Sequence, residues 1–335
     1  MATLDDEALG ALPLRRLREL FFPLFGGRAA WRKQHLLPIF VTIFAGLALI
    51  SIYNNGGAVN DTDVLKLASR VYLIVAVYIA FLINCYIYEM CGRATNWLLI
   101  AVVAYWTFAA HGSSLLWHNR WYALFNWIIP AEQWRQSSHF VVRLAGAFAG
   151  YGLGEESFKS LPLFVFVLFG AGLVFLGSRT SGNVSALLMA AAKRFSLRGP
   201  LDGIVLGAAS ATGFFIKETL GQYVPETMSH VHDAGLKAFD GLVFTLGRLI
   251  PQIGGHCAYS GLFGYYIGLS ALQPRKAAYV LPLGWVSAAA LHGVFDTVSL
   301  SLRLVVSVLS YALLAGAIFT AREISVTSTF LPPTR

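Results

Sequence analysis

Apolar stretches long enough to cross a lipid bilayer recur along the whole chain. A membrane-spanning α-helix needs about 20 mostly apolar residues. Stretches of this kind lie at about 36–53, 71–90, 97–110, 155–177, 201–222, 241–270, 278–299 and 303–320. Only 13% of the residues are charged, against about 25% in typical soluble domains. The sequence therefore predicts an all-α, polytopic membrane helix bundle with about eight transmembrane helices.

The Lys and Arg residues between these stretches are distributed unevenly. With the N-terminus inside, most of them fall in the inner segments, as the positive-inside rule requires. The net charge of +8 thus follows the membrane topology, so we expect the lipid bilayer, and no nucleic acid, as a partner. The expected location is a bacterial inner (plasma) membrane, with the N-terminus in the cytoplasm.

Four regions are expected along the chain. Residues 1–35 form a basic cytoplasmic or interfacial segment, and 36–137 hold N-terminal transmembrane helices and a Trp-rich interfacial loop. A transmembrane core follows at 138–320, with a C-terminal tail at 321–335. Residues 138–152 are apolar enough for a ninth span, but a ninth span would move a basic loop outside. We therefore expect an interfacial or re-entrant helix at 138–152.

Several ionisable residues lie inside the apolar stretches of the core, where a charge costs several kcal/mol unless it faces a cavity or a partner. They are Glu155, Glu156, Lys159, Glu218, Arg248, His256, His292 and Asp296. The predicted direction of each span places these residues, from four spans, in the outer half of the membrane. A structural network of ion pairs would account for any single pair. The common depth of the whole set instead predicts one buried polar site.

The spacing within each span indicates which side chains are neighbours. Lys159 lies four residues after Glu155 and three after Glu156, and Asp296 lies four after His292; both spacings place side chains on one helix face. Two adjacent carboxylates cannot both ionise cheaply in a low dielectric. One of them can pair with Lys159 while the other takes a proton from water, and a histidine can hold that water or donate to an oxyanion. This combination favours amide hydrolysis by activated water.

A metal ion is the alternative within hydrolysis. His256 and His292, with Glu218 or Glu155, have the donor types of a catalytic zinc site that keeps one position open for water. The sequence has no H-E-x-x-H motif, so the local spacing does not require zinc. No cofactor is therefore certain, and zinc stays an open alternative.

Four short motifs, in this order, resemble the PrsW family of intramembrane proteases, within the superfamily of CAAX-prenyl endopeptidases. The motifs are E-E-x-x-K at Glu155, Glu156 and Lys159; F-x-x-x-E at Phe214 and Glu218; an Arg and a later His at Arg248 and His256; and L-H-G-x-x-D at Leu291, His292, Gly293 and Asp296. The resemblance covers roughly residues 150–300. It implies a glutamate-type intramembrane peptidase whose catalytic core is the 138–320 region.

The same resemblance implies roles and a substrate. Glu155 and Glu156 would be catalytic and His256 and His292 would assist them, while Lys159, Glu218, Arg248 and Asp296 would support the site. The substrate would be a membrane-anchored protein or peptide, similar to an anti-sigma factor.

Two other functions compete with this prediction. A non-catalytic scaffold, related to the scaffold subunit of gamma-secretase, could keep packing histidines but would not need the acidic pair. A proton-coupled transporter also uses buried Glu, His and Lys residues. It should show inverted repeats or paired broken helices, and the sequence displays neither.

Overall fold

The computed structural model describes residues 79–80, 82–91, 95, 97–112, 131–218, 223, 226, 230, 233–234 and 238–329. The predicted N-terminal segment 1–35 and the span 36–53 lie outside these residues, as do most of the Trp-rich loop and part of the span 71–90. All regular secondary structure in the described part is helical, which confirms the all-α part of the predicted fold class.

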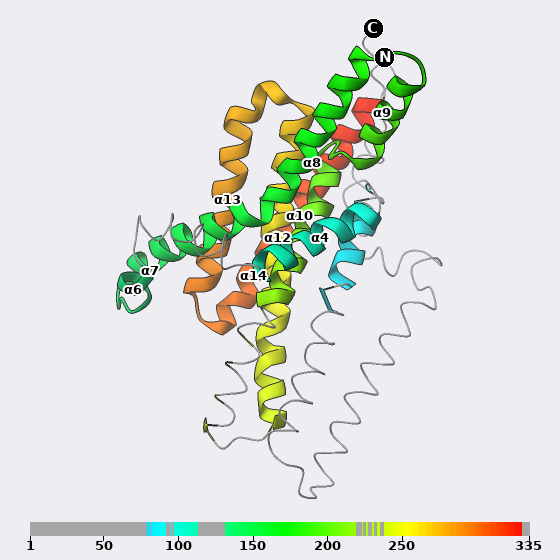
Figure 1. The fold of residues 1–335 in the computed structure, drawn as a ribbon. Coiled ribbons are helices and arrows are strands. Elements are labelled where there is room, and N and C mark those ends of the chain that lie inside the picture. Colours follow the sequence, from blue (N-terminus) through cyan, green and yellow to red (C-terminus); the bar gives the residue numbers. More distant parts are fainter. Residues whose placement is uncertain are drawn as a thin grey trace, which may run out of the picture.

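The helices follow one another with short connections. In chain order they are α4 (Trp97–Gly112), α6 (Ala131–Arg135), α7 (Phe140–Ala147), η1 (Phe148–Leu153), α8 (Gly154–Arg179), α9 (Gly182–Phe195), α10 (Pro200–Glu218), α12 (Ala238–Leu272), η3 (Pro274–Lys276), α13 (Ala277–Thr297) and α14 (Leu300–Thr329). Helices α10, α12, α13 and α14 form the main bundle (Figure 1).

The described residues confirm fewer membrane spans than the sequence predicts for the whole chain. Three helical segments of the described chain are long and apolar enough to cross a membrane: Phe140–Arg179, Pro274–Thr297 and Leu300–Ile324. A fourth is added if α9 and α10, which are bent by 60° at their junction, count as one broken span. The chain is thus an integral membrane protein, but the described residues do not confirm about eight spans.

Residues 138–152 were expected to form an interfacial or re-entrant helix, and in the structure this helix continues into the next one. Here α7, η1 and α8 form one continuous helical segment, Phe140–Arg179. The segment "AGAFAGYGLG" contains no proline to end the helix, and a Cβ on its Gly152 would overlap the carbonyl oxygen of Ala289 on α13. The helix therefore packs closely against α13 at Gly152. The helix accommodates this contact with a π-helical turn, η1, a feature that is frequent near functional sites.

Helices α10 and α12 pack closely because glycines line both surfaces. A Cβ on Gly203 would overlap the carbonyl oxygen of Gly264, and a Cβ on Gly264 would overlap that of Gly203. Gly207 faces the backbone of Ser260 in the same way, and Gly268 faces Gly199. Small residues at such spacing let helix backbones approach each other within a membrane. This contact fixes the position of the middle of α12 along the axis of α10.

We expect Gly264→Ala to destabilise the protein by forcing α10 and α12 apart. Overpacking of this kind costs about 1–3 kcal/mol of unfolding free energy. Gly172→Ala on α8 is the matched control, because nothing lies within 4 Å of a Cβ at that position. Thermal unfolding in detergent should give a lower midpoint for Gly264→Ala and no decrease for Gly172→Ala. Equal midpoints would contradict the close α10–α12 contact.

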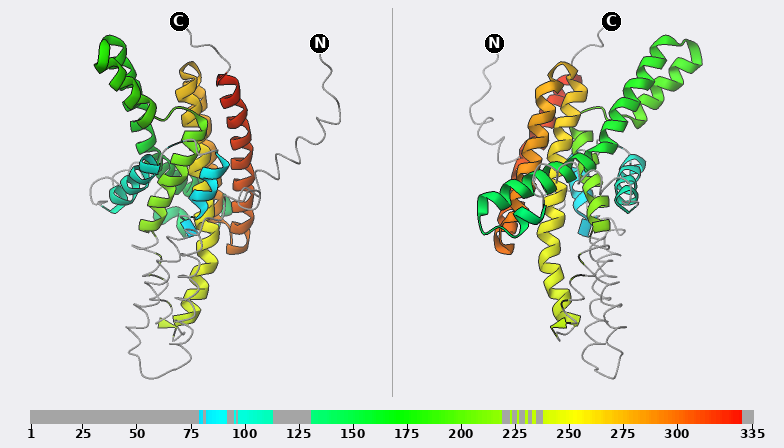
Figure 2. Two further views of the ribbon diagram at one scale, coloured as in Figure 1. Left: turned by 90° about the vertical axis from the view of Figure 1, so that its right-hand side faces the viewer. Right: turned by 60° about the vertical axis from the view of Figure 1, so that its left-hand side comes forward.

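Only the beginning of α8 belongs to the bundle. Its residues from Gly154 to Leu163 are mostly buried, whereas Leu168 is 71% exposed. The remainder of α8 pairs with α9, where the Ser185 hydroxyl donates to the carbonyl oxygen of Gly177 at 2.7 Å. This α8–α9 hairpin leans away from the bundle (Figure 2). The acidic start of α8 is therefore held inside the protein, and its apolar end faces outward.

Candidate active site

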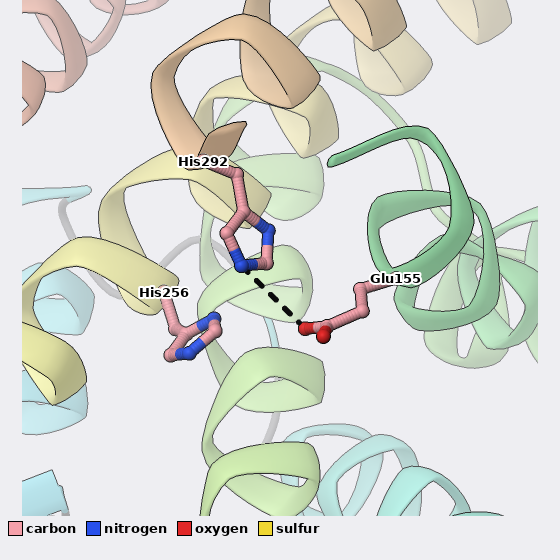
Figure 3. A group of neighbouring side chains, drawn as sticks. All are labelled: Glu155, His256 and His292. Atoms are coloured by element: carbon pink, nitrogen blue, oxygen red, sulfur yellow. Dashed lines mark ion pairs between the residues drawn. The ribbon is translucent and has the colours of Figure 1, made fainter. Parts of the chain in front are cut away.

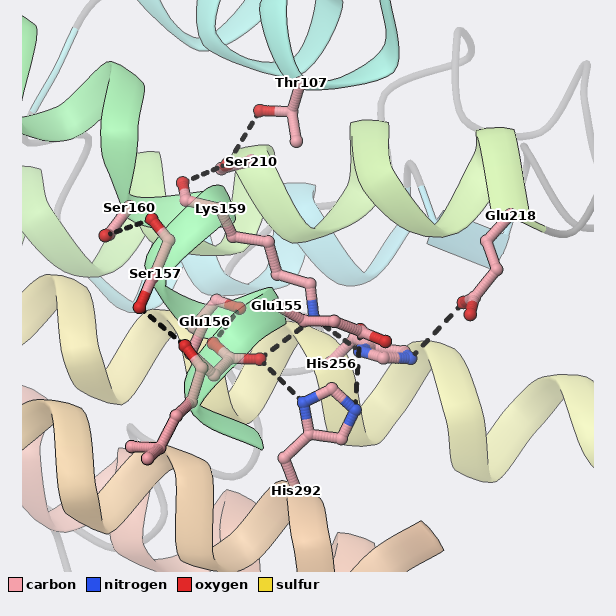
Figure 4. Close-up of polar contacts among 12 residues, drawn as sticks. Thr107, Glu155, Glu156, Ser157, Lys159, Ser160, Ser210, Glu218, His256 and His292 are labelled. Carbon is pink, nitrogen blue, oxygen red and sulfur yellow. Dashed lines mark hydrogen bonds and ion pairs between the residues drawn. The ribbon is translucent and has the colours of Figure 1, made fainter. Parts of the chain in front are cut away.

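The predicted polar residues converge from four helices. Glu155 and Glu156 lie in the first turn of α8, directly after η1, and Lys159 follows one turn later. His256 lies in α12 and His292 in α13. The side chains of these residues point toward one another, with Glu218 at the end of α10 nearby (Figure 4). All of these residues except Glu218 are buried.

Glu156 is bound on both of its carboxylate oxygens. Oε1 lies 2.9 Å from Lys159 Nζ and 3.0 Å from His292 Nδ1. Oε2 accepts a hydrogen bond of 2.7 Å from the Ser260 hydroxyl. The side chain is fully buried, and buried carboxylates are stable only with such partners. Glu156 therefore joins α8 to α12 and α13, and protein groups contact both of its oxygens.

Lys159 places its ammonium group at the centre of the cluster. Nζ lies 3.2 Å from Glu155 Oε2 and 2.9 Å from His256 Nδ1, in addition to its contact with Glu156. It also lies 4.4 Å from the centre of the Phe214 ring. An ammonium group can only donate hydrogen bonds, so His256 Nδ1 accepts one. In the neutral imidazole the proton is then on Nε2.

Glu155, His256 and His292 form a compact group at the same place (Figure 3). Each offers one ligand atom, and these atoms lie within 4.8 Å of one another. His292 Nε2 lies 3.6 Å from Glu155 Oε2, and the two imidazole rings are perpendicular with their centres 4.8 Å apart. Two histidines and a glutamate are the donor set of several catalytic zinc sites. The residues therefore fit a metal ion.

The supporting residues lie at the rim of this group. Glu218 Oε2 is 3.8 Å from His256 Nε2, and Asp296 Oδ2 is 3.3 Å from His292 Nε2. Glu218 Oε2 is buried and makes no hydrogen bond among the described residues. Arg248 lies two turns before His256 on α12, but its side chain lies outside the described part of the chain.

The sequence analysis missed Ser260 and Tyr259. Ser260 lies four residues after His256 and so shares its helix face. Tyr259 is fully buried, and its ring stacks on His292 at 5.4 Å with an angle of 28° between the planes. Helical spacing from His256 could have indicated Ser260. No sequence pattern indicates the ring stack, because it depends on how α13 packs against α12.

The comparison with protein families gives one match. Residues 95–321 match the profile of the PrsW family, which is described as an intramembrane metalloprotease. The match extends over more than half of the chain. The chain belongs to the PrsW family. In the comparisons with curated proteins and with solved structures, nothing matches.

Membership of the PrsW family identifies the protein as a membrane peptidase. The matched range includes all the residues of the polar cluster. The family description also implies a metal ion, and the Glu155, His256 and His292 donors described above fit one. The catalytic roles of the individual residues stay a prediction.

Proposed function

We propose that this PrsW-family protein hydrolyses a peptide bond of a membrane-associated protein at the buried cluster. One observation carries the proposal: Glu155, His256 and His292, from three separate helices, bring their ligand atoms within 4.8 Å of one another. Groups that can accept a proton, orient water and stabilise an oxyanion are thereby close enough to act on one scissile bond.

The two adjacent glutamates have different roles in this proposal. Glu156 is held by Lys159, His292 and Ser260, so it positions its neighbours. Glu155 faces the two imidazole rings and accepts the proton of the attacking water at Oε2. His256, whose Nδ1 accepts from Lys159 at 2.9 Å, has Nε2–H available to donate to the carbonyl oxygen of the scissile bond. Such a donor stabilises the charge that develops on that oxygen.

In an alternative arrangement, Glu155, His256 and His292 would hold a zinc ion. A neutral imidazole has only one nitrogen without a proton, so His256 would use that nitrogen for the metal and Lys159 would no longer donate to Nδ1. When bound, zinc acts as a Lewis acid that polarises water and the scissile carbonyl. Glu155 would then be a ligand rather than the proton acceptor. Glu218 Oε2, which is buried and has no hydrogen-bond partner among the described residues, would take over that proton. The two arrangements differ in their need for metal, so metal analysis separates them.

The proposed substrate is a membrane-anchored protein or peptide similar to an anti-sigma factor. The proposed membrane is a bacterial plasma membrane, with the N-terminus in the cytoplasm and the cut in the outer half of the bilayer. The family match and the depth of the polar residues along their predicted spans support this part of the proposal.

Reconstituted protein tests the proposal directly. We expect the wild-type chain in liposomes to cleave single-pass membrane substrates, with new termini that mass spectrometry can map. The zinc arrangement predicts about one metal ion per chain, loss of cleavage with a chelator and recovery with zinc. His292→Ala should lose both the metal and the cleavage. The glutamate arrangement predicts cleavage that a chelator does not affect. If no membrane substrate is cut under either condition, the proposal is wrong.

A further inference from the structure

We propose that Ser260 is a positioning residue for the proposed hydrolysis. Its hydroxyl fixes the Glu156 carboxylate, and Glu156 in turn holds the Nδ1 edge of the His292 ring. The inference rests on the proposed function, because the importance of His292 depends on it. Ser260 lies outside all four motifs by which the sequence resembles its family.

Two hydrogen bonds link Ser260 to His292 through Glu156. The Ser260 hydroxyl donates to Glu156 Oε2 at 2.7 Å. The opposite oxygen, Oε1, accepts from Lys159 Nζ and contacts His292 Nδ1 at 3.0 Å. A carboxylate only accepts hydrogen bonds when ionised, so His292 Nδ1 carries the hydrogen. The other ring nitrogen, Nε2, faces Glu155 (Figure 4). It also lies 3.3 Å from Asp296 Oδ2.

Ser260 is itself held firmly in place. It lies in the α10–α12 contact, where a Cβ on Gly207 would overlap the Ser260 carbonyl oxygen. The side chain is only 4% exposed, so water does not readily replace its hydroxyl. The neighbouring Tyr259 packs its ring against the face of His292. Consecutive residues of α12 therefore constrain His292 in two ways: Tyr259 directly against the ring face, and Ser260 through Glu156 at the ring edge.

Removing the hydroxyl would leave Glu156 Oε2 buried without that donor. An unsatisfied buried acceptor is unfavourable, and the carboxylate can reduce the cost by rotating about its terminal bond toward Lys159. This rotation would move Oε1 away from His292 Nδ1. The ring would then lose the partner of its Nδ1 edge and would be held only from the Nε2 side, by Asp296 and Glu155. Partners that orient a functional histidine typically contribute 10–100-fold to activity or metal affinity.

The test compares two serines of the same helix. Ser260→Ala is expected to lower kcat by about 10–100-fold, with KM for the membrane substrate unchanged. Ser260→Cys keeps a similar volume with a weaker donor and should fall between Ser260→Ala and the wild type. Ser270→Ala is the matched control, because the Ser270 hydroxyl is buried but bonds only to Ile267 of its own helix. We expect its kcat to equal that of the wild type.

A spectroscopic readout separates positioning from a general packing effect. In protein labelled with ¹⁵N-histidine, His292 of the wild type should show the Nδ1–H signal. Ser260→Ala should shift or broaden this Nδ1–H signal, whereas Ser270→Ala should keep the wild-type spectrum. A wild-type kcat and an unchanged His292 spectrum in Ser260→Ala would overturn the inference while leaving the proposed function intact. If Glu155→Gln were fully active, the proposed function would fail, but the His292 spectrum would still decide the role of Ser260.

Discussion

Glu155→Gln is expected to reduce cleavage of a membrane substrate by roughly 10²–10⁴-fold, the usual contribution of a positioned general base. The amide has the same shape as the carboxylate but cannot accept a proton from water, and it is a poor zinc ligand. The loss is therefore expected whether Glu155 acts as base or as ligand. Stability should change little, because Lys159 keeps its contact with Glu156 at 2.9 Å.

The measurement is the initial rate of product formation in liposomes, together with the thermal unfolding midpoint of each variant. Glu323→Gln is the matched control, since Glu323 lies exposed on α14. It should retain wild-type activity. A Glu155→Gln variant with a wild-type rate would remove Glu155 from the mechanism, whatever the metal content of the protein.

The sequence predicted the contacts that lie within a single helix. Lys159 meets both Glu155 and Glu156, and His292 meets Asp296, because side chains three or four residues apart share a helix face. The positions of α4, α10, α12 and α13 also follow the apolar stretches closely. These features depend on the period of one helix and need no knowledge of its neighbours.

The different environments of Glu155 and Glu156 could not be predicted from the sequence. The two residues are adjacent and differ by about 100° around the helix axis. Which of them faces Ser260, and which faces the two histidines, depends on the packing of α8 against α12 and α13. The close contact between Gly152 and Ala289 of α13 depends on the packing of the helices in the same way.

Hydropathy alone also does not identify every long helix of this bundle as a membrane span. Helix α12 has 35 residues, yet it is not among the three segments that are apolar enough to be recognised as spans. Its central part, "PQIGGHCAYSGLFGY", is almost entirely buried by other helices. Polar and glycine residues are tolerated there because the surface faces protein and not lipid. One helix of the functional centre thus meets the composition criteria for a span less well than α8 and α13 do.

Lys159→Met is expected to produce the largest loss of stability. The ammonium group is fully buried between Glu155 and Glu156 and contacts both. Without it, two adjacent carboxylates remain in the protein interior with no cation from α8. Removing one partner of a buried ion pair costs about 3–5 kcal/mol. We expect a much lower unfolding midpoint in detergent and no measurable cleavage. Lys217→Met on α10 is the control and should keep both properties.

A second substitution distinguishes lost charge balance from lost packing. In the double variant Lys159→Met with Glu156→Gln, the uncompensated charge of Glu156 is gone. If the loss of charge balance is the main cause of the instability of Lys159→Met, the double variant should be more stable than Lys159→Met alone. This holds even though Glu156→Gln by itself destabilises the protein. Such non-additivity is the measure of direct coupling between two residues. The double variant should still not cleave the substrate, because His256 lacks Lys159 and His292 lacks the Glu156 carboxylate. Strictly additive midpoint shifts would mean that Lys159 and Glu156 do not interact, and would contradict the ion pair at the centre of the site.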